Sequence, residues 1–111
     1  MEEKTMTLKE FIEKMCNGWG FARPGRVIQI GKALSKIIPE QDLNTVVKVK
    51  TEWSSSGYGP DFRYHYRWYI DGYKPPFNEN ARIVDTQTLL FGGSFPFIRL
   101  TEDGFVVGYD K

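Results

Sequence analysis

The chain has 111 residues, 41% of them hydrophobic and 26% charged, a balance typical of one soluble domain with a sizeable core and not of a disordered chain. Lysine and arginine number 15 against 14 acidic residues, and the resulting net charge of +1 excludes a generally polycationic protein that coats nucleic acid. The single cysteine, Cys16, excludes an intramolecular disulfide, and one histidine beside it is too few for a structural zinc site. We therefore expect one globular domain over residues 1–111, with no metal and no other cofactor.

The segment that precedes the first predicted helix is charged and contains no apolar run of signal-peptide length. No stretch elsewhere approaches the roughly 20 apolar residues that a transmembrane helix requires. We expect a cytoplasmic protein that does not enter a membrane.

The first predicted helix begins at a capping box, because Thr7 is followed three residues later by Glu10. The helix should end near Asn17 and Gly18, which tolerate the left-handed conformation of a helix C-terminus. Its apolar stripe at helical spacing consists of Leu8, Phe11, Ile12 and Met15.

A second helix is predicted between Pro24 and Pro39. A proline is tolerated near the start of a helix, as at Pro24, but it ends a helix that reaches it, as at Pro39. The alternative is a strand over residues 26–30 that hands over to a helix at Gly31. The helical stripe consists of Val27, Ile30, Ala33, Leu34, Ile37 and Ile38.

From Thr45 the hydrophobic period changes from 3.6 to 2, which indicates strands. Residues 45–53 and 62–70 each alternate in this way, with a glycine-rich loop between them, and predict a long antiparallel hairpin. We expect the large groups of the second strand to pack on the two helices; they are Phe62, Tyr64, Tyr66, Trp68 and Ile70.

Residues 81–91 suggest a third strand, bulged near Asp85, and residues 96–110 a terminal hairpin that turns at Asp103 and Gly104. Helices first and strands afterwards predict an α+β fold, in which two N-terminal helices pack on one face of a mainly antiparallel sheet of about four to five strands.

The opposite face of the long hairpin is a candidate binding surface. If the two strands pair, this face carries a group of cations with a tyrosine at its edge and Glu52 as its only acid; the group consists of Lys48, Lys50, Arg63, His65, Arg67 and Tyr69. Cations beside an aromatic ring on a strand face suit nucleic acid or an acidic protein surface. The alternatives are a solvated face whose charges discourage edge pairing, and a face covered by the C-terminal hairpin.

Two glycine-rich loops form a second candidate surface. They display aromatic and arginine residues of the kind that anchor protein interfaces; these are Trp19, Phe21, Arg23, Arg26 and Tyr58. The alternative for Trp19 and Phe21 is that they fold back onto the core.

The sequence supplies no residue set that is specific for catalysis. Cys16 is placed at a helix C-terminus, where the helix dipole disfavours a thiolate, and no third residue is spaced to orient His65. The glycine-rich segments lack the spacing of a phosphate-binding loop. We therefore expect no catalytic residue and no metal ligand.

The sequence favours a small non-enzymatic binding module that recognises an anionic partner, either nucleic acid or an acidic protein surface, through the basic sheet face. One alternative is an inhibitor or adaptor of the kind that phages and mobile elements encode, which binds a protein through its aromatic loops. Another is a small enzyme whose cleft the sequence does not reveal. An uncovered strand at residues 81–91 would pair two copies across a two-fold axis, so the sequence leaves a homodimer open.

Overall fold

The computed structural model describes residues 3–76 and 96–110. Its elements in chain order are β1 (Glu3–Thr7), α1 (Leu8–Cys16), α2 (Gly25–Ile37), β2 (Val46–Ser56), β3 (Arg63–Asp71), β4 (Phe97–Leu100) and β5 (Gly104–Asp110), with short 3-10 turns at Gly18–Gly20, Glu40–Asp42 and Gly59–Asp61. The predicted third strand at 81–91 lies outside the described residues.

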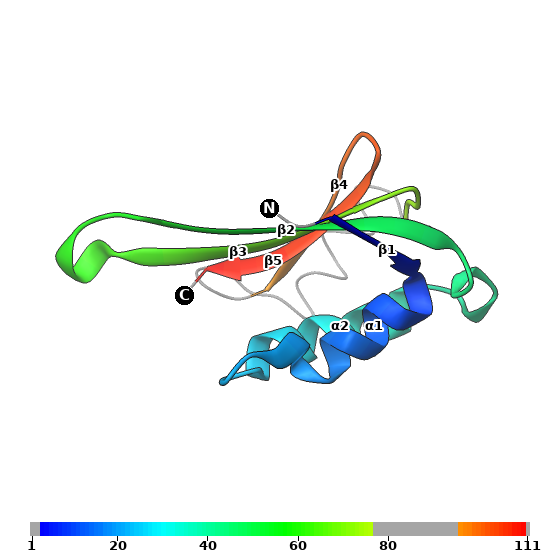
Figure 1. Cartoon of the computed structure of the whole chain (residues 1–111), viewed down its shortest axis with the longest axis horizontal. Coiled ribbons are helices and arrows are strands. Elements are labelled where there is room, and N and C mark those ends of the chain that lie inside the picture. Colours follow the sequence, from blue (N-terminus) through cyan, green and yellow to red (C-terminus); the bar gives the residue numbers. More distant parts are fainter. Residues whose placement is uncertain (1–2, 77–95, 111) are drawn as a thin grey trace.

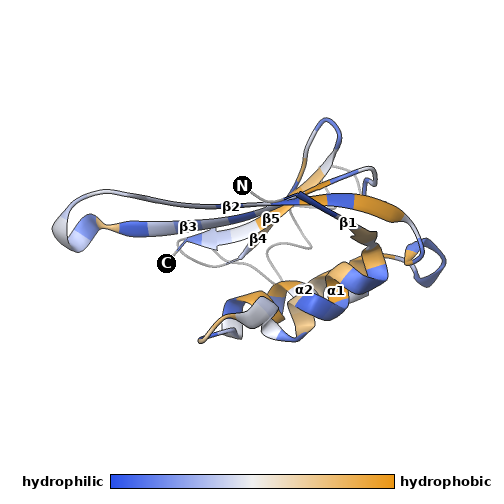
Figure 2. Cartoon of the chain, viewed as in Figure 1, coloured by the Kyte–Doolittle hydropathy of each residue, from blue (hydrophilic) through white to orange (hydrophobic). Residues whose placement is uncertain are grey.

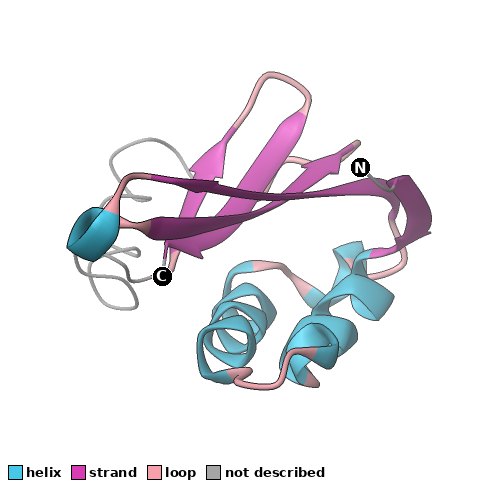
Figure 3. Ribbon diagram, turned by 60° about the vertical axis from the view of Figure 1, so that its left-hand side comes forward, coloured by secondary structure: helices cyan, strands magenta, loops and turns pink. Residues whose placement is uncertain are grey.

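The five described strands form one antiparallel sheet in the order β1-β2-β3-β5-β4. Helices α1 and α2 lie together on one face of this sheet (Figures 1 and 3). The predicted α+β fold, with two N-terminal helices on a mainly antiparallel sheet, is therefore confirmed.

The start of α1 follows the predicted capping box. The Thr7 hydroxyl accepts a hydrogen bond from the Glu10 N–H at 3.2 Å, and the Glu10 carboxylate accepts one from the Thr7 N–H at 3.3 Å. These two bonds satisfy N–H groups that a helix start leaves without partners. The predicted stripe is the buried face of α1; it consists of Leu8, Phe11, Ile12 and Met15.

The second segment is a helix from its start, so the alternative with a strand at residues 26–30 is wrong. The two helices approach closely at Gly31, where an added Cβ would lie 2.6 Å from the backbone nitrogen of Cys16. The spacing between α1 and α2 therefore requires a residue without a side chain.

The alternation in β2 and β3 separates the two faces of the sheet as predicted. Val49 pairs with Ile70 and Thr51 with Trp68, and this face meets the helices. Trp68 has no exposed surface and is the largest fully buried side chain. In Figure 2 the hydrophobic residues gather on the helices and on the part of the sheet above them.

The hairpin of β2 and β3 is longer than the helical layer that covers it. At about 1.5 Å per residue the 13 residues of α2 span about 20 Å, whereas the 11 residues of β2 span about 36 Å at 3.3 Å per residue. The far end of the hairpin therefore projects beyond the helices, as Figure 1 shows.

This overhang corrects one expectation about the core. Trp68 and Ile70 pack under the helices with no exposed surface, but Phe62 is 41% and Tyr64 48% exposed. The expectation that Phe62 and Tyr64 pack on the helices is wrong, because these residues lie on the hairpin beyond the layer that would cover them.

The strand β1 is an addition that the sequence did not predict. It pairs with β2 from Glu3 opposite Lys50 to Thr7 opposite Val46. The terminal hairpin of β4 and β5 is confirmed, with Asp103 and Gly104 at its turn.

Candidate functional site

The exposed aromatic residues gather at the far end of the β2–β3 hairpin. We call residues 53–66 the distal hairpin; it contains Trp53, Tyr58, Phe62 and Tyr64, which are 46%, 89%, 41% and 48% exposed. Among the described residues, Val46 is the one other large hydrophobic residue that is exposed. An apolar surface concentrated in one place on a small domain is typical of an interaction site.

Four rings of the distal hairpin form a continuous ladder that reaches the core; they belong to Phe62, Tyr64, Tyr66 and Trp53. Phe62 contacts Tyr64 edge to face with centroids 4.9 Å apart, and Tyr64 stacks on Tyr66 at 6.4 Å. Tyr66 in turn contacts Trp53 at 5.5 Å, and Trp53 contacts Trp68 at 4.9 Å. Each exposed ring of the ladder is thus held by a neighbour.

Tyr109 lies at the inner end of the same ladder, with its ring centroid 5.0 Å from that of Tyr66. Burial, and next the nearby Tyr66, raise the pKa of Tyr109 to about 12, while Arg26 acts in the opposite direction. The Tyr109 hydroxyl therefore stays neutral at physiological pH.

One edge of the distal hairpin has no strand beside it in the described chain. Strand β1 pairs with β2 only up to Lys50, whereas β2 continues to Ser56. On this edge, none of the described strands pairs with the backbone between Thr51 and Ser56. Edges of this kind support recognition by strand addition.

The structure brings the predicted basic residues onto one face of the sheet, opposite the helices. The register pairs Lys50 with Tyr69 and Ser56 with Arg63, and the same face holds Lys48, His65 and Arg67. This face is less basic than expected, because Glu52 is not its only acid: Glu3, Asp71 and Asp110 share it.

Ion pairs neutralise part of this basic face. The Lys50 ammonium lies 3.6 Å from the Glu3 carboxylate, and Asp110 binds both His65 and Arg67 at 2.9 Å. Arg67 also lies over the Phe97 ring, 4.6 Å from its centroid. Within residues 3–76 and 96–110, Lys48 and Arg63 are the exposed members of the predicted set that have no ion-pair partner.

A chain of hydrogen bonds crosses this face through His65. The Ser56 hydroxyl lies 2.7 Å from His65 Nε2, and His65 Nδ1 lies 2.9 Å from Asp110 Oδ1. Burial by itself would raise the pKa of Asp110, but the hydrogen bonds from His65 and Arg67 and the charge of Arg67 outweigh it and hold that pKa below its ordinary value. We did not predict a role for Asp110 from the sequence, because its position beside His65 depends on the pairing of β3 with β5.

The atom order of Ser56, His65 and Asp110 matches that of a serine hydrolase triad. A nucleophilic serine also needs a concave substrate site and donors for the developing oxyanion. Ser56 is exposed on a strand, and it does not line either of the two hollows beside Trp19 that are described below. We therefore assign these bonds a structural role, in which they tie the distal hairpin to β5.

The two aromatic residues of the first loop, Trp19 and Phe21, both pack against the core. The alternative stated for them, that they fold back onto the core, is therefore the correct one. Trp19 contacts Phe11 and Trp68 at 5.8 and 6.1 Å, and Phe21 contacts Tyr66 at 5.5 Å. Arg23 is exposed, Arg26 is half-buried and near Tyr109, and Tyr58 is exposed at the tip of the distal hairpin. The predicted loop residues therefore do not form one surface. Trp19 and Phe21 pack at the edge of the core, and Tyr58 lies on the distal hairpin.

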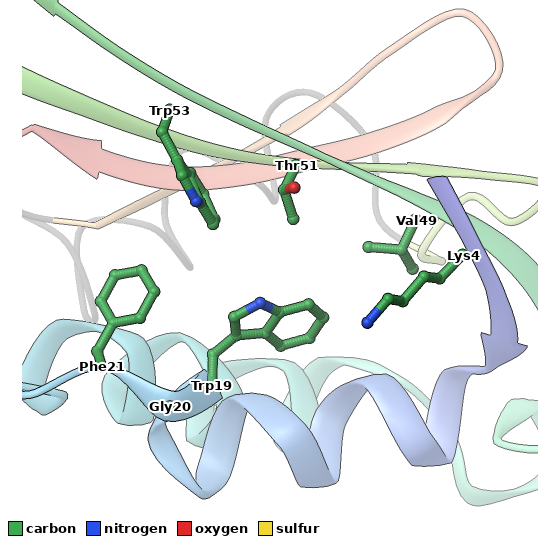
Figure 4. Close-up of a pocket in the computed structure, with 7 residues that line it drawn as sticks. All are labelled: Lys4, Trp19, Gly20, Phe21, Val49, Thr51 and Trp53. Carbon is green, nitrogen blue, oxygen red and sulfur yellow. The ribbon is translucent and has the colours of Figure 1, made fainter. Parts of the chain in front are cut away.

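A cleft of about 260 Å³ opens between the helical layer and the edge formed by β1 and β2. Trp19 and Phe21 line its helical side, while Thr51 and Trp53 line its sheet side (Figure 4). Lys4 extends from β1 toward the ring of Trp19. Lys4 is the one charged side chain among the described residues that line this cleft.

Within the described residues, no group of three or more His, Cys, Asp or Glu side chains is arranged to hold a metal ion. Cys16 lies between the two helices beside Gly31, and His65 lies on the opposite face of the sheet, so these two residues do not form a catalytic pair. None of the described helices has the length and apolar character needed to cross a bilayer.

Comparisons of the chain with protein-family models, with curated proteins and with solved structures found no match.

Proposed function

We propose that this protein is a non-enzymatic binding module that docks a protein partner through the distal hairpin. The observation that carries the proposal is the gathering of Trp53, Tyr58, Phe62 and Tyr64, which are exposed on one projecting element. Tryptophan and tyrosine are enriched among the residues that dominate binding energy at protein interfaces. This proposal develops the inhibitor or adaptor alternative: it keeps Tyr58 as an anchor and replaces Trp19 and Phe21 by Trp53, Phe62 and Tyr64.

The packing of the hairpin supports a role in binding because it lowers the cost of association. A flexible side chain loses about 0.5–1.5 kcal/mol when an interface immobilises it. Tyr64 is already held between Phe62 and Tyr66, and Trp53 between Tyr66 and Trp68. Much of the entropic cost of immobilising these rings is therefore incurred on folding and does not weaken the binding of a partner.

The unpaired edge of β2 supplies a second kind of contact. A partner strand laid beside residues 51–56 would form main-chain hydrogen bonds there, and the neighbouring aromatic rings would select its side chains. Strand addition combined with aromatic anchors suits a protein partner better than a small molecule.

A second proposal keeps the anionic partner that the sequence favoured, either nucleic acid or an acidic protein surface. It is supported by the shared face of Lys48, Lys50, Arg63, His65 and Arg67, with Tyr69 among them. We place it second because Glu3 and Asp110 already pair with three of these residues.

A capture experiment separates the two proposals. Tagged wild type, the double variant Phe62→Ser and Tyr64→Ser, and the control Val46→Ser are incubated with lysate of the native host, with and without nuclease. If the first proposal is right, wild type and Val46→Ser each capture one protein in stoichiometric amount. Nuclease does not change this capture, and the double variant does not capture the protein. Nucleic acid that disappears with nuclease and is retained by the double variant would support the basic face instead.

Val46→Ser is a matched control because Val46 is 61% exposed but begins β2, at the end of the hairpin opposite the aromatic residues. It removes a similar exposed apolar group without touching the aromatic ladder. Equal loss of capture with this control would mean that general surface hydrophobicity, and not the distal hairpin, holds the partner.

A further inference from the structure

The cleft beside β1 contains a backbone conformation that is uncommon for a bulky residue. Trp19 has φ +52°, and within residues 3–76 and 96–110 it is the one non-glycine residue with a positive φ. It stands between Gly18 and Gly20, at φ +86° and +82°. A bulky residue held in the left-handed region costs of order 1–3 kcal/mol, and such strain is concentrated at ligand clamps and other functional positions.

The strained turn fixes the ring of Trp19 as one wall of the cleft. The ring rests edge to face on Phe11 at 5.8 Å and on Trp68 at 6.1 Å. Figure 4 shows the indole lying along the floor of the cleft, with Trp53 above it and Phe21 beside it. Aromatic rings therefore face the same space from both layers of the fold.

One lysine lines this cleft, and a second lies next to it against the ring of Trp19. Lys4 lines the space between the layers, and together with Lys14 it also lines a second hollow that continues past Trp19. Lys14 lies 5.5 Å from the centroid of the Trp19 ring. Neither lysine has a carboxylate within ion-pair distance among the described residues, unlike Lys50 on the other face of the sheet.

We propose that this cleft binds a small aromatic anion, with its ring against Trp19 and Trp53 and its anionic group between Lys4 and Lys14. The rings provide flat apolar surface for a planar group, and the two ammonium groups provide charge complementarity for a carboxylate or phosphate. The volume of about 260 Å³ is just below the usual range of small-molecule sites, so the ligand is limited to one or two fused rings with one charged group. The sheet side contributes two neutral polar groups, the hydroxyl of Thr51 and the indole N–H of Trp53.

This site does not depend on the distal hairpin's partner, although Trp53 borders both surfaces. Tyr64 and Phe62 belong to the hairpin and not to the described lining of the cleft. The variant Tyr64→Ser therefore tests the hairpin while leaving the cleft intact, and failure of one proposal does not decide the other.

The test uses the full chain labelled with ¹⁵N and titrated with 1-naphthyl phosphate. The indole N–H signals of the three tryptophans report on the cleft directly, because Trp19 and Trp53 line it and Trp68 lies behind both. We expect saturable shifts of the Trp19 and Trp53 signals. Inorganic phosphate, which lacks the ring, and 1-naphthylmethanol, which lacks the charge, should each bind more weakly.

Substitutions of single lysines identify the charge that is used. Lys4→Gln and Lys14→Gln should each raise the dissociation constant about three- to tenfold, the range expected for one partly screened charged contact. Lys9→Gln is the matched control, because Lys9 is an exposed lysine of the same helix as Lys14 and does not line either hollow. It should leave the dissociation constant unchanged.

The proposal is overturned if millimolar 1-naphthyl phosphate gives no saturable shift of the Trp19 and Trp53 signals. It is also overturned if Lys4→Gln and Lys14→Gln bind like Lys9→Gln, or if Lys48→Gln, on the opposite face, weakens binding more than they do. All four lysine variants replace exposed side chains, and the dispersion of the same spectra verifies that each variant is folded.

Discussion

Trp53 and Trp68 lie on neighbouring strands with their ring centroids 4.9 Å apart and their planes at 70°, yet Trp68 is fully buried and Trp53 is 46% exposed. This pair marks the boundary between the covered part of the sheet and the distal hairpin. An exposed ring that rests on the core is a rigid anchor, because its position is fixed before any partner arrives. The proposed docking surface thus begins where the helical layer ends.

The close approach of the helices at Gly31 predicts a specific sensitivity. Gly31→Ala should lower the free energy of unfolding by about 1–3 kcal/mol, because the new methyl group would overlap the backbone of Cys16. Urea denaturation measures the change. Gly25→Ala is the control, since a Cβ at Gly25 meets no atom within 4 Å, and this variant should be as stable as wild type or slightly more so. Equal destabilisation by both variants would contradict the account of the helix crossing.

The two arginines of β3, Arg63 at its start and Arg67 at its centre, should differ in their effect on stability. Arg67 donates to the carbonyl oxygens of Tyr66 and Tyr109 at 2.9 and 3.3 Å and pairs with Asp110, so Arg67→Ala should cost about 1–3 kcal/mol. Arg63 is exposed without such partners in the described chain, so Arg63→Ala should stay within about 0.5 kcal/mol of wild type. Chemical denaturation of both variants decides the point. If Arg63→Ala is the more damaging variant, the assigned contacts are wrong.

This difference also determines how the anionic-partner proposal should be tested. Charge reversal at Arg67 would disturb the tie between β3 and β5, so a loss of binding there would be ambiguous. Lys48→Glu together with Arg63→Glu changes the exposed charges of the face without breaking an ion pair that the structure describes.

The depressed pKa of Asp110 predicts a loss of stability in acid. An ordinary aspartate has a pKa of about 3.9, and the folded state holds Asp110 below that value. The stabilisation is therefore fully present above about pH 4 and is lost as the pH falls through the lower pKa of the folded state. It should amount to less than about 1 kcal/mol, because the 33% exposed carboxylate is partly screened by water.

Denaturation curves recorded between about pH 5 and pH 2 measure this contribution. Asp110→Asn should be less stable than wild type at neutral pH and should lose less stability on acidification. Asp61→Asn, at an exposed aspartate in the hairpin loop, should keep the wild-type slope. An unchanged slope for Asp110→Asn would remove Asp110 from the acid response.

The structural role of the bonds between Ser56, His65 and Asp110 predicts low serine reactivity. A fluorophosphonate reagent should modify Ser56 no faster than Ser54 or Ser55, its neighbours on the same strand, as measured by peptide mass spectrometry. Selective modification of Ser56 that disappears in His65→Ala would instead indicate an activated nucleophile, and the enzyme alternative would then apply.

The sequence predicted the elements whose signals are local. The capping box at Thr7 and Glu10, the stop at Pro39 and the change of period at Thr45 each depend on neighbouring residues, and all three agree with the structure. The basic residues could be assigned to one face because alternation along two paired strands requires it.

The features that were missed depend on tertiary arrangement. β1 is short and mainly exposed, and it shows its strand character only beside β2. The exposure of Phe62 and Tyr64 was missed because they continue the same alternating apolar pattern as the buried Trp68. No local signal in the sequence indicates where the helices stop covering the sheet. Asp110 reaches His65 across 45 positions of sequence through the register of β3 and β5. The cleft around Trp19 forms only where the turn at Gly18–Gly20, β1 and β2 come together in the fold, so it has no local signal in the sequence.

The central claim, that the distal hairpin docks a protein partner, is tested most directly by placing a photoreactive phenylalanine analogue at Tyr64 and, in a separate variant, at Lys32 on the exposed side of α2. Irradiation in the native host followed by mass spectrometry shows which position contacts another chain. The account predicts one dominant protein adduct from position 64 and none from position 32. Adducts from position 32 alone, or none from position 64 while wild type still captures its partner, would contradict it.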